Sequence, residues 1–144
     1  MKIKKNLSIK FRAKTFYFAS FFLPKNTRED IENLYTFCRY LDDIGDKKKV
    51  KKKESIKQLD EIKKNIKKKN AKNFIISNFI SLQQKYKIDN KTVFHLIDGI
   101  KTDLNKTVDI KDDKQLIVYC YSVAGTVGFM FCKIINVTDK ELYF

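Results

Sequence analysis

The chain has 144 residues and a formal net charge of +14, with 31 Lys plus Arg against 17 Asp plus Glu. Hydrophobic residues make up 43% of it, and only one proline and four glycines occur, which excludes a disordered chain and disfavours a turn-rich β-sandwich. Coding bias toward lysine would explain the positive charge. So would an anionic partner, such as nucleic acid, a membrane surface or a phosphorylated substrate.

The N-terminal segments are basic and then strongly aromatic. Residues 1–14 (MKIKKNLSIKFRAK) form a basic lead-in without the apolar core of a signal peptide, so a cytoplasmic protein is expected. Residues 15–23 (TFYFASFFL) form a dense apolar run that ends at Pro24. The run is compatible with a buried strand or with a short buried helix, because periodicity does not distinguish the two at this length.

Residues 26–46 predict a helix. Asn26 and Thr27 are good N-cap residues, and Glu29 and Asp30 follow them as capping-box partners. Apolar side chains then recur at helical spacing, at Ile31, Leu34, Cys38 and Leu41.

The rest of the chain predicts a series of helices. Residues 47–53 are a charged run, predicted as a solvated loop. The helices predicted after it cover the amphipathic series Ile56, Leu59, Ile62 and Ile66, then residues 74–85, residues 92–104 with a cap at Asp89 and Asn90, and residues 115–135. No repeat or linker divides the chain, so one all-α domain over residues 1–144 is expected.

The last predicted helix, residues 115–135, is long and apolar enough to raise the question of a transmembrane span. It contains Lys133 and several hydroxyl residues, so full burial inside a larger soluble bundle explains it better. Ala124, Gly125 and Gly128 are small, which would let another helix or a long apolar ligand approach closely. Tight helix packing alone explains them equally well.

One face of the 26–46 helix carries a polar stripe. Tyr35, Arg39, Asp42 and Asp46 follow one another at spacings of four, three and four residues. Two carboxylates one turn apart suit a hard cation such as Mg²⁺, and Arg39 would contact them or a phosphate. The simpler interpretation is an acidic helix end exposed to water, with Arg39 in an ordinary intrahelical pair. Because Asp near a helix C-terminus opposes the macrodipole, its presence there needs a reason.

Other candidate residues carry less information. Cys38, Cys120 and Cys132 have no metal-type spacing and are predicted to be small buried apolar residues. His95 lies among apolar residues and is predicted to be packed or half exposed rather than catalytic. The lysine runs contain few aromatic residues, so a nucleic-acid interpretation rests on charge alone, and no nucleic-acid partner is expected.

Four segments, taken in order, resemble a known family. KTFYFASFFLP, LYTFCRYLDDIGD, LIDGIKTDL and YCYSVAGTVG follow the order and approximate spacing of the squalene/phytoene synthase family. DDIGD resembles that family's first aspartate-rich motif, and YCYSVAGTVG is most similar to the phytoene and dehydrosqualene synthases. The resemblance covers the chain from Lys14 onward and implies the all-α isoprenoid (terpenoid) synthase fold.

The resemblance also implies site residues and a reaction, the Mg²⁺-dependent head-to-head condensation of two prenyl diphosphates through a cyclopropyl diphosphate. Asp42 and Asp46 would bind Mg²⁺ bridging to a diphosphate, with Asp43 in support. Arg39 and Tyr35 would line the same pocket. Residues implied to touch the rest of the substrate are Lys14, Thr15 and Phe16 around the diphosphate and first isoprene unit, and Tyr119, Val123, Ala124, Val127 and Gly128 along the prenyl channel.

The chain departs from the family pattern in one respect. The second aspartate-rich helix that follows YCYSVAGTVG in the family is absent before Phe144. The chain is therefore expected to be the N-terminal portion of an incomplete domain, with little activity alone. The insoluble hydrocarbon product and the excess of Lys imply loose attachment of this cytoplasmic protein to the inner membrane face.

The preferred interpretation is a phytoene synthase acting on geranylgeranyl diphosphate in carotenoid biosynthesis. A squalene or dehydrosqualene synthase acting on farnesyl diphosphate is the alternative within the family. A non-catalytic relative acting as an assembly factor is the alternative from another class.

Overall fold

The structure is a computed structural model that describes residues 13–46, 52–104 and 110–137. Every regular element in these ranges is helical, which confirms the predicted all-α class. The elements are α2 (Lys14–Ser20), α3 (Lys25–Gly45), α4 (Lys52–Lys67), α5 (Phe74–Lys85), α6 (Asn90–Asp103), α7 (Asp113–Cys120), the π-helical turn η2 (Tyr121–Gly125) and α8 (Thr126–Ile134). The predicted basic lead-in lies outside the described residues, apart from its last two positions. Most of the predicted 47–53 loop does too, and α4 already begins at Lys52.

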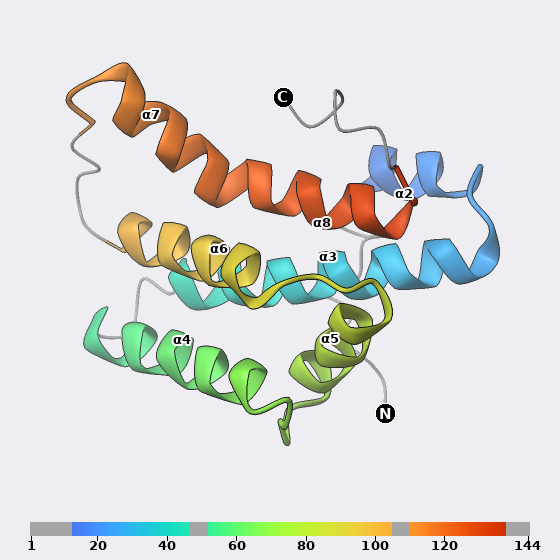
Figure 1. Cartoon of the computed structure of the whole chain (residues 1–144), viewed down its shortest axis with the longest axis horizontal. Helices are drawn as coiled ribbons and strands as arrows, with labels where there is room; N and C mark the ends of the chain where they lie inside the picture. Colours follow the sequence, from blue (N-terminus) through green and yellow to red (C-terminus); the bar gives the residue numbers. More distant parts are fainter. Residues whose placement is uncertain (1–12, 47–51, 105–109, 138–144) are drawn as a thin grey trace.

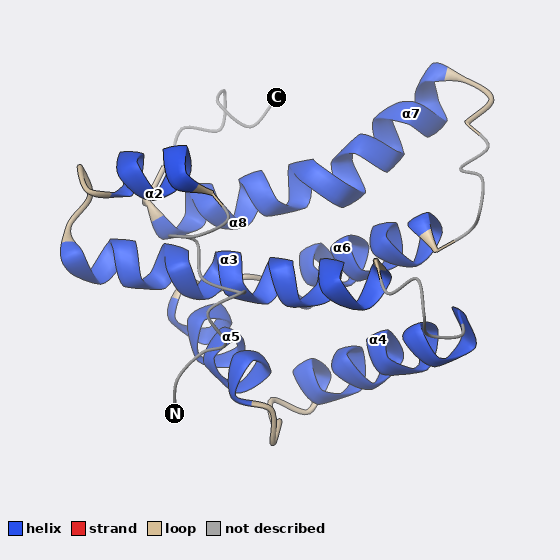
Figure 2. Ribbon diagram, turned by 180° about the vertical axis from the view of Figure 1, so that it is seen from behind, coloured by secondary structure: helices blue, strands red, loops and turns tan. Residues whose placement is uncertain are grey.

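The helices are arranged around α3. In Figure 1, α3 runs through the middle of the molecule beside α6, with α4 and α5 on one side and the rod formed by α7, η2 and α8 on the other. Figure 2 shows the same order from behind. The helix α3 packs against α5, α8, α6 and α4, and α6 packs against η2, α8 and α4. The helix α6 therefore connects the core around α3 to the rod.

The core is formed by the apolar stripes that the periodicity predicts. Leu34 and Leu41 of α3, and Leu59 and Ile66 of α4, are buried. At its centre, the rings of Phe37 and Phe79 are stacked, with centroids 3.6 Å apart and planes 5° from parallel, and both side chains are fully buried. The pair joins α3 to α5.

Helix caps confirm one prediction and correct another. Asp89 caps α6 as predicted, because its carboxylate accepts hydrogen bonds from the Thr92 backbone N–H and hydroxyl, both at 2.8 Å. The predicted caps at Asn26 and Thr27 are wrong. The helix α3 already begins at Lys25 with Pro24 at the N-cap and no side-chain cap bond. The fixed φ of proline lets the helix start earlier and places both predicted caps within the first turn.

The aromatic run after residue 14 is helical, but the prediction that it is buried is wrong. Phe18 is 67% exposed and Phe22 is 83% exposed. The prediction of three buried cysteines is also wrong for Cys120, which is exposed. Cys38 is half-buried, and desolvation of its thiol raises the pKa to about 12.

The predicted helix 115–135 is present as a continuous helical stretch from Asp113 to Ile134, interrupted in its hydrogen-bonding pattern by η2. The Ser122 and Thr126 hydroxyls donate to the carbonyls of Val118 and Ser122, at 2.8 and 2.9 Å, and such bonds to the preceding turn commonly bend a helix.

The prediction that this stretch is fully buried is wrong within this chain, because α7 and η2 contain no buried residue. By length and composition the stretch is apolar enough to cross a membrane, with a mean hydropathy of 1.5. A single such helix is weak evidence for a span. An apolar surface that covers it is equally compatible with the composition.

A glycine sets the closest approach between α6 and the rod. A Cβ on Gly99 would lie 2.9 Å from Cγ1 of Val123 and 3.2 Å from the carbonyl carbon of Ser122. The close contact foreseen from small residues on the last helix is thus made by a glycine on the facing helix. By contrast, a Cβ on Gly128 would meet no atom within 4 Å.

Candidate functional site

The C-terminal half of α3 presents the predicted polar stripe. Asp42 and Asp46 are exposed there, whereas Tyr35, Arg39 and Asp43 are partly buried. Asp46 is the C-cap residue, and its backbone N–H donates to the Asp42 carbonyl at 2.8 Å. The two predicted metal ligands thus lie one turn apart at the end of the helix.

Arg39 is engaged within the helix. Its guanidinium contacts the Asp43 carboxylate at 2.7 Å, across one turn. Its Nε is buried and has no hydrogen-bond partner in the described part of the chain. The intrahelical pair considered from the sequence is therefore present, and it involves Asp43 rather than Asp42 or Asp46.

The electrostatics of Asp42 connect α3 to α6. Although part of this side chain is exposed, desolvation by the protein atoms around the carboxyl is the largest influence and raises the pKa, and the Arg39 guanidinium opposes that effect. Like charges then raise the pKa further, those of Asp46, Asp43 and Asp103. Asp103 lies at the end of α6, so α3 and α6 bring their negative charges close together. We call these four residues the carboxylate face.

Tyr119 joins the carboxylate face from α7. Its hydroxyl donates to the Asp103 carboxylate at 2.7 Å, and this bond is the main cause that raises the pKa of Tyr119. A phenol held this way stays protonated and keeps its oxygen at one position. Asp103 lies within the matching segment LIDGIKTDL, but its bond to Tyr119 joins residues 16 apart, which no local pattern reveals.

Of the remaining residues predicted to line the prenyl channel, two are packed against other helices and two are exposed. Val123 lies against Gly99 of α6, and Val127 packs against the hydrophobic core. Ala124 and Gly128 are exposed. An exposed apolar side of the rod thus adjoins Tyr119 and Val123, and a prenyl chain would need an additional wall there.

The structure does not join the predicted residues of α2 to the carboxylates. Lys14 and Thr15 are exposed, and no hydrogen bond or ion pair among the described residues links either of them to Asp42 or Asp46. The side chain of Phe16 lies outside the described part of the structure. Their predicted role at the diphosphate stays a prediction.

The carboxylate face has the donor chemistry for a hard cation but not a closed site. Among the described residues, no group of three or more His, Cys, Asp or Glu side chains is arranged to hold a metal ion. Carboxylate oxygens on adjacent helix turns nevertheless fit a Mg²⁺ ion that keeps water and phosphate oxygens as its other ligands. Desolvation of the Asp42 carboxyl raises its pKa first, the neighbouring carboxylates raise it further, and Arg39 compensates only in part.

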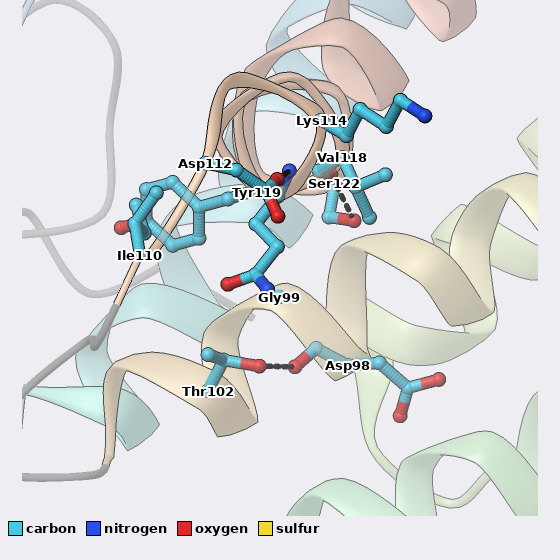
Figure 3. A pocket seen from close by; sticks show the side chains of 10 residues that line it. Asp98, Gly99, Thr102, Ile110, Asp112, Lys114, Val118, Tyr119 and Ser122 are labelled. Carbon is cyan, nitrogen blue, oxygen red and sulfur yellow. Dashed lines mark hydrogen bonds between the residues drawn. The ribbon is translucent and has the colours of Figure 1, made fainter.

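A pocket of about 420 Å³ lies between α6 and α7 and was not foreseen from the sequence (Figure 3). Its lining comprises Asp98, Gly99, Thr102, Ile110, Asp112, Lys114, Gln115, Val118, Tyr119 and Ser122. Figure 3 shows the Asp98 carboxylate directed away from the pocket, and the ammonium group of Lys63 on α4 contacts this carboxylate at 2.5 Å. Tyr119 is thus the residue shared by the pocket and the bond to the carboxylate face.

Replacing Asp103 with asparagine is expected to lower the pKa of Tyr119 toward 10.0, because the charged acceptor is lost. A ¹⁹F NMR titration of the chain labelled with 3-fluorotyrosine would measure it, with Tyr119→Phe assigning the resonance. Asp98→Asn is the matched control on the same helix, and its carboxylate contacts Lys63 instead. An unchanged Tyr119 titration in Asp103→Asn would contradict the bond.

The helical arrangement defines the class of protein. The chain superimposes on a squalene synthase from Alicyclobacillus acidocaldarius with a TM-score of 0.79 at 20% identity, over 96% of this chain and 52% of that one. It also matches a dehydrosqualene synthase solved in complex with a ligand, with a TM-score of 0.74 at 27% identity, over 88% and 44% of the two chains. The fold is thus the isoprenoid synthase helical fold.

A family model described as squalene/phytoene synthase matches residues 9–143, and the chain belongs to that family. Among curated relatives, the presqualene diphosphate synthase of Rhodopseudomonas palustris is 24% identical over 88% of this chain and 46% of its own length. The chloroplastic phytoene synthase 1 of Zea mays is 29% identical over 90% and 32%. The 4,4'-diapophytoene synthase of Staphylococcus haemolyticus is 26% identical over 90% and 46%. The chain spans about half, or less, of the length of these relatives.

Proposed function

We propose that this chain provides the diphosphate-binding portion of a prenyltransferase that joins two prenyl diphosphates head to head. The observation that carries the proposal is the carboxylate face with Arg39 and Tyr119 beside it, in a chain that matches the family over residues 9–143. Geranylgeranyl diphosphate is the proposed substrate and phytoene the proposed product, by way of a cyclopropyl diphosphate. Relatives named presqualene diphosphate synthase and 4,4'-diapophytoene synthase make farnesyl diphosphate the alternative.

Asp42 and Asp46 would hold Mg²⁺, with Asp43 in support. When bound, the ion offsets the negative charge that develops on a departing diphosphate. Arg39 places a guanidinium one turn before Asp43, where it compensates the carboxylates and faces the same end of the helix. Tyr119 holds a protonated phenol beside them through Asp103.

The apolar side of the rod would exclude water from the allylic cation that remains after diphosphate departure. Val123 and Val127 lie on the covered side of this rod, whereas Ala124 and Gly128 are exposed and require a partner surface. Because the relatives are about twice as long or longer, we propose that activity requires the remaining part of their fold. We further propose a cytoplasmic protein attached loosely to the inner membrane face, since the net charge is +14.

The test is an assay of two proteins, the chain alone and the chain joined to the part of the solved dehydrosqualene synthase that it does not match. Each receives farnesyl or geranylgeranyl diphosphate with Mg²⁺, and products are identified by mass spectrometry. A cyclopropyl diphosphate or hydrocarbon from the joined protein, with little from the chain alone, is the expected result. A folded joined protein that consumes neither substrate would favour the non-catalytic relative instead.

A further inference from the structure

The start of the chain carries an exposed aromatic surface that the proposed reaction does not use. We define it as Phe18, Phe21 and Phe22, which are 67%, 53% and 83% exposed. The rings of Phe18 and Phe22 meet edge to face, with centroids 6.1 Å apart. Three large apolar side chains that stay exposed to water within five residues mark a candidate interaction surface.

Basic side chains border this aromatic surface. Lys14 and Lys25 are exposed before and after it in the chain. The Arg28 guanidinium lies over the Phe21 ring, with its central carbon 4.9 Å from the ring centroid. Lys14 and Lys25 thus flank the aromatic surface in the chain, and the guanidinium of Arg28 lies directly on it.

Acidic side chains close by do not cancel this charge. Glu29 is exposed in the first turns of α3. The next acidic residue, Asp30, is only slightly exposed and is engaged by Lys85 and by the Tyr86 hydroxyl, at 2.5 and 2.7 Å. The local balance therefore stays positive, as it is for the whole chain.

The position of α2 distinguishes this surface from the other exposed apolar area. Figure 1 shows α2 at the edge of the molecule, next to the N-terminal end of α3. The exposed side of α7, at Ile117 and Val118, instead adjoins the pocket and Tyr119, where the rest of the relatives' fold is needed. On that side the exposed Lys111 and Lys114 are matched by the exposed Asp112 and Asp113, so the local charge is balanced.

We propose that the aromatic surface of α2 docks the chain onto an anionic lipid bilayer. Aromatic rings insert to the level of the headgroup and acyl boundary, while nearby Lys and Arg side chains bind anionic headgroups. This assigns a surface to the peripheral attachment proposed above, but it does not depend on the reaction. Because Lys25 is exposed and follows Phe22 by only three residues, insertion of Phe18 and Phe22 would bring it close to the headgroups.

The test is cosedimentation of the full chain with vesicles of phosphatidylcholine alone and of phosphatidylcholine mixed with phosphatidylglycerol. We expect binding to the anionic vesicles, weakened by salt. The double variant Phe18→Ser with Phe22→Ser is expected to lose at least about tenfold in partitioning. Lys25→Glu is expected to lose about fivefold or more, because each basic residue near the surface contributes on that order.

Phe74→Ser, at an exposed phenylalanine on α5, is the matched control and is expected to bind as the parent does. Circular dichroism confirms that each variant is folded. Equal binding of the parent and the double variant would overturn the proposal. Failure of the parent to bind would also overturn it. In that case, self-association of the parent in gel filtration that is lost in the double variant would show that a second copy of the chain covers the aromatic surface. Without such self-association, the surface would be assigned to a further polypeptide segment. Vesicle binding requires no turnover, so neither result decides the proposed reaction.

Discussion

Asp42→Asn and Asp46→Asn are each expected to reduce Mg²⁺-dependent product formation by about 100-fold or more in the joined protein that tests the proposed function. Each substitution removes a charged oxygen ligand while keeping the size of the side chain. Asp43→Asn is the matched variant within the same turn, and it is expected to lose less, because the Asp43 carboxylate is engaged by Arg39. Initial rates at saturating substrate over a Mg²⁺ titration would measure the effects.

The Asp42→Asn substitution is expected to lower activity but not the stability of the folded chain. Its pKa is raised from 3.8 in the folded chain, so the folded state binds the proton more tightly than the unfolded chain does. Stability therefore falls as the pH rises from below 3.8 through the raised value, and the carboxylate is unfavourable for folding at neutral pH. Asp42→Asn removes that cost and should unfold at an equal or higher urea concentration at pH 7.

Measuring both activity and urea unfolding of Asp42→Asn distinguishes a functional carboxylate from a structural one. A residue retained for stability would lose stability on substitution, whereas a ligand retained for function would lose activity alone. If Asp42→Asn keeps full activity, or if its activity falls only in proportion to lost stability, the assignment of Asp42 to the metal site is wrong.

Phe37→Ala is expected to destabilise the chain by about 3–5 kcal/mol. Its ring is fully buried and stacked on Phe79 at 3.6 Å, so the substitution removes both apolar burial and a ring contact between α3 and α5. A loss of that size is a large share of the stability of a typical domain. Urea unfolding followed by circular dichroism would measure it.

Phe74→Ala is the control, since this phenylalanine is 42% exposed, and a change within about 0.5 kcal/mol is expected. Phe37→Leu keeps most of the volume and should recover part of the lost stability. Equal effects of Phe37→Ala and Phe74→Ala would show that the stacked pair is not the centre of the core.

Local sequence signals predicted the helices well because each signal acts within a few residues. The bounds of α5 coincide with the prediction, and the Asp89 cap forms as its spacing indicates. The prediction at the start of α3 is wrong because Pro24, through its fixed φ, outweighs the side-chain caps that follow it. The spacing of the stripe on α3 likewise placed Asp42 and Asp46 on adjacent turns.

Features that depend on tertiary contact were not predictable in this way. The bond between Tyr119 and Asp103 requires α7 to return beside the end of α6, and the close approach at Gly99 requires the same packing. The exposure of Phe18 and Phe22 was not predicted for a related reason. An apolar sequence indicates a surface that favours burial, but not whether another part of the same chain covers it. The family resemblance indicated which residues to examine, but not that Arg39 would contact Asp43.

The π-helical turn at Tyr121–Gly125 sets the rotational phase of two half-helices. A turn of this kind contains one residue more than an α-turn, and one residue corresponds to about 100° around the axis. Tyr119, which bonds Asp103, lies before the turn, and Met130, which is buried in the core, lies after it. The orientation of the Tyr119 phenol at the carboxylate face and the packing of α8 in the core therefore depend on each other. Inserting or deleting one residue between Tyr119 and Met130 would misalign either the phenol or the buried face of α8.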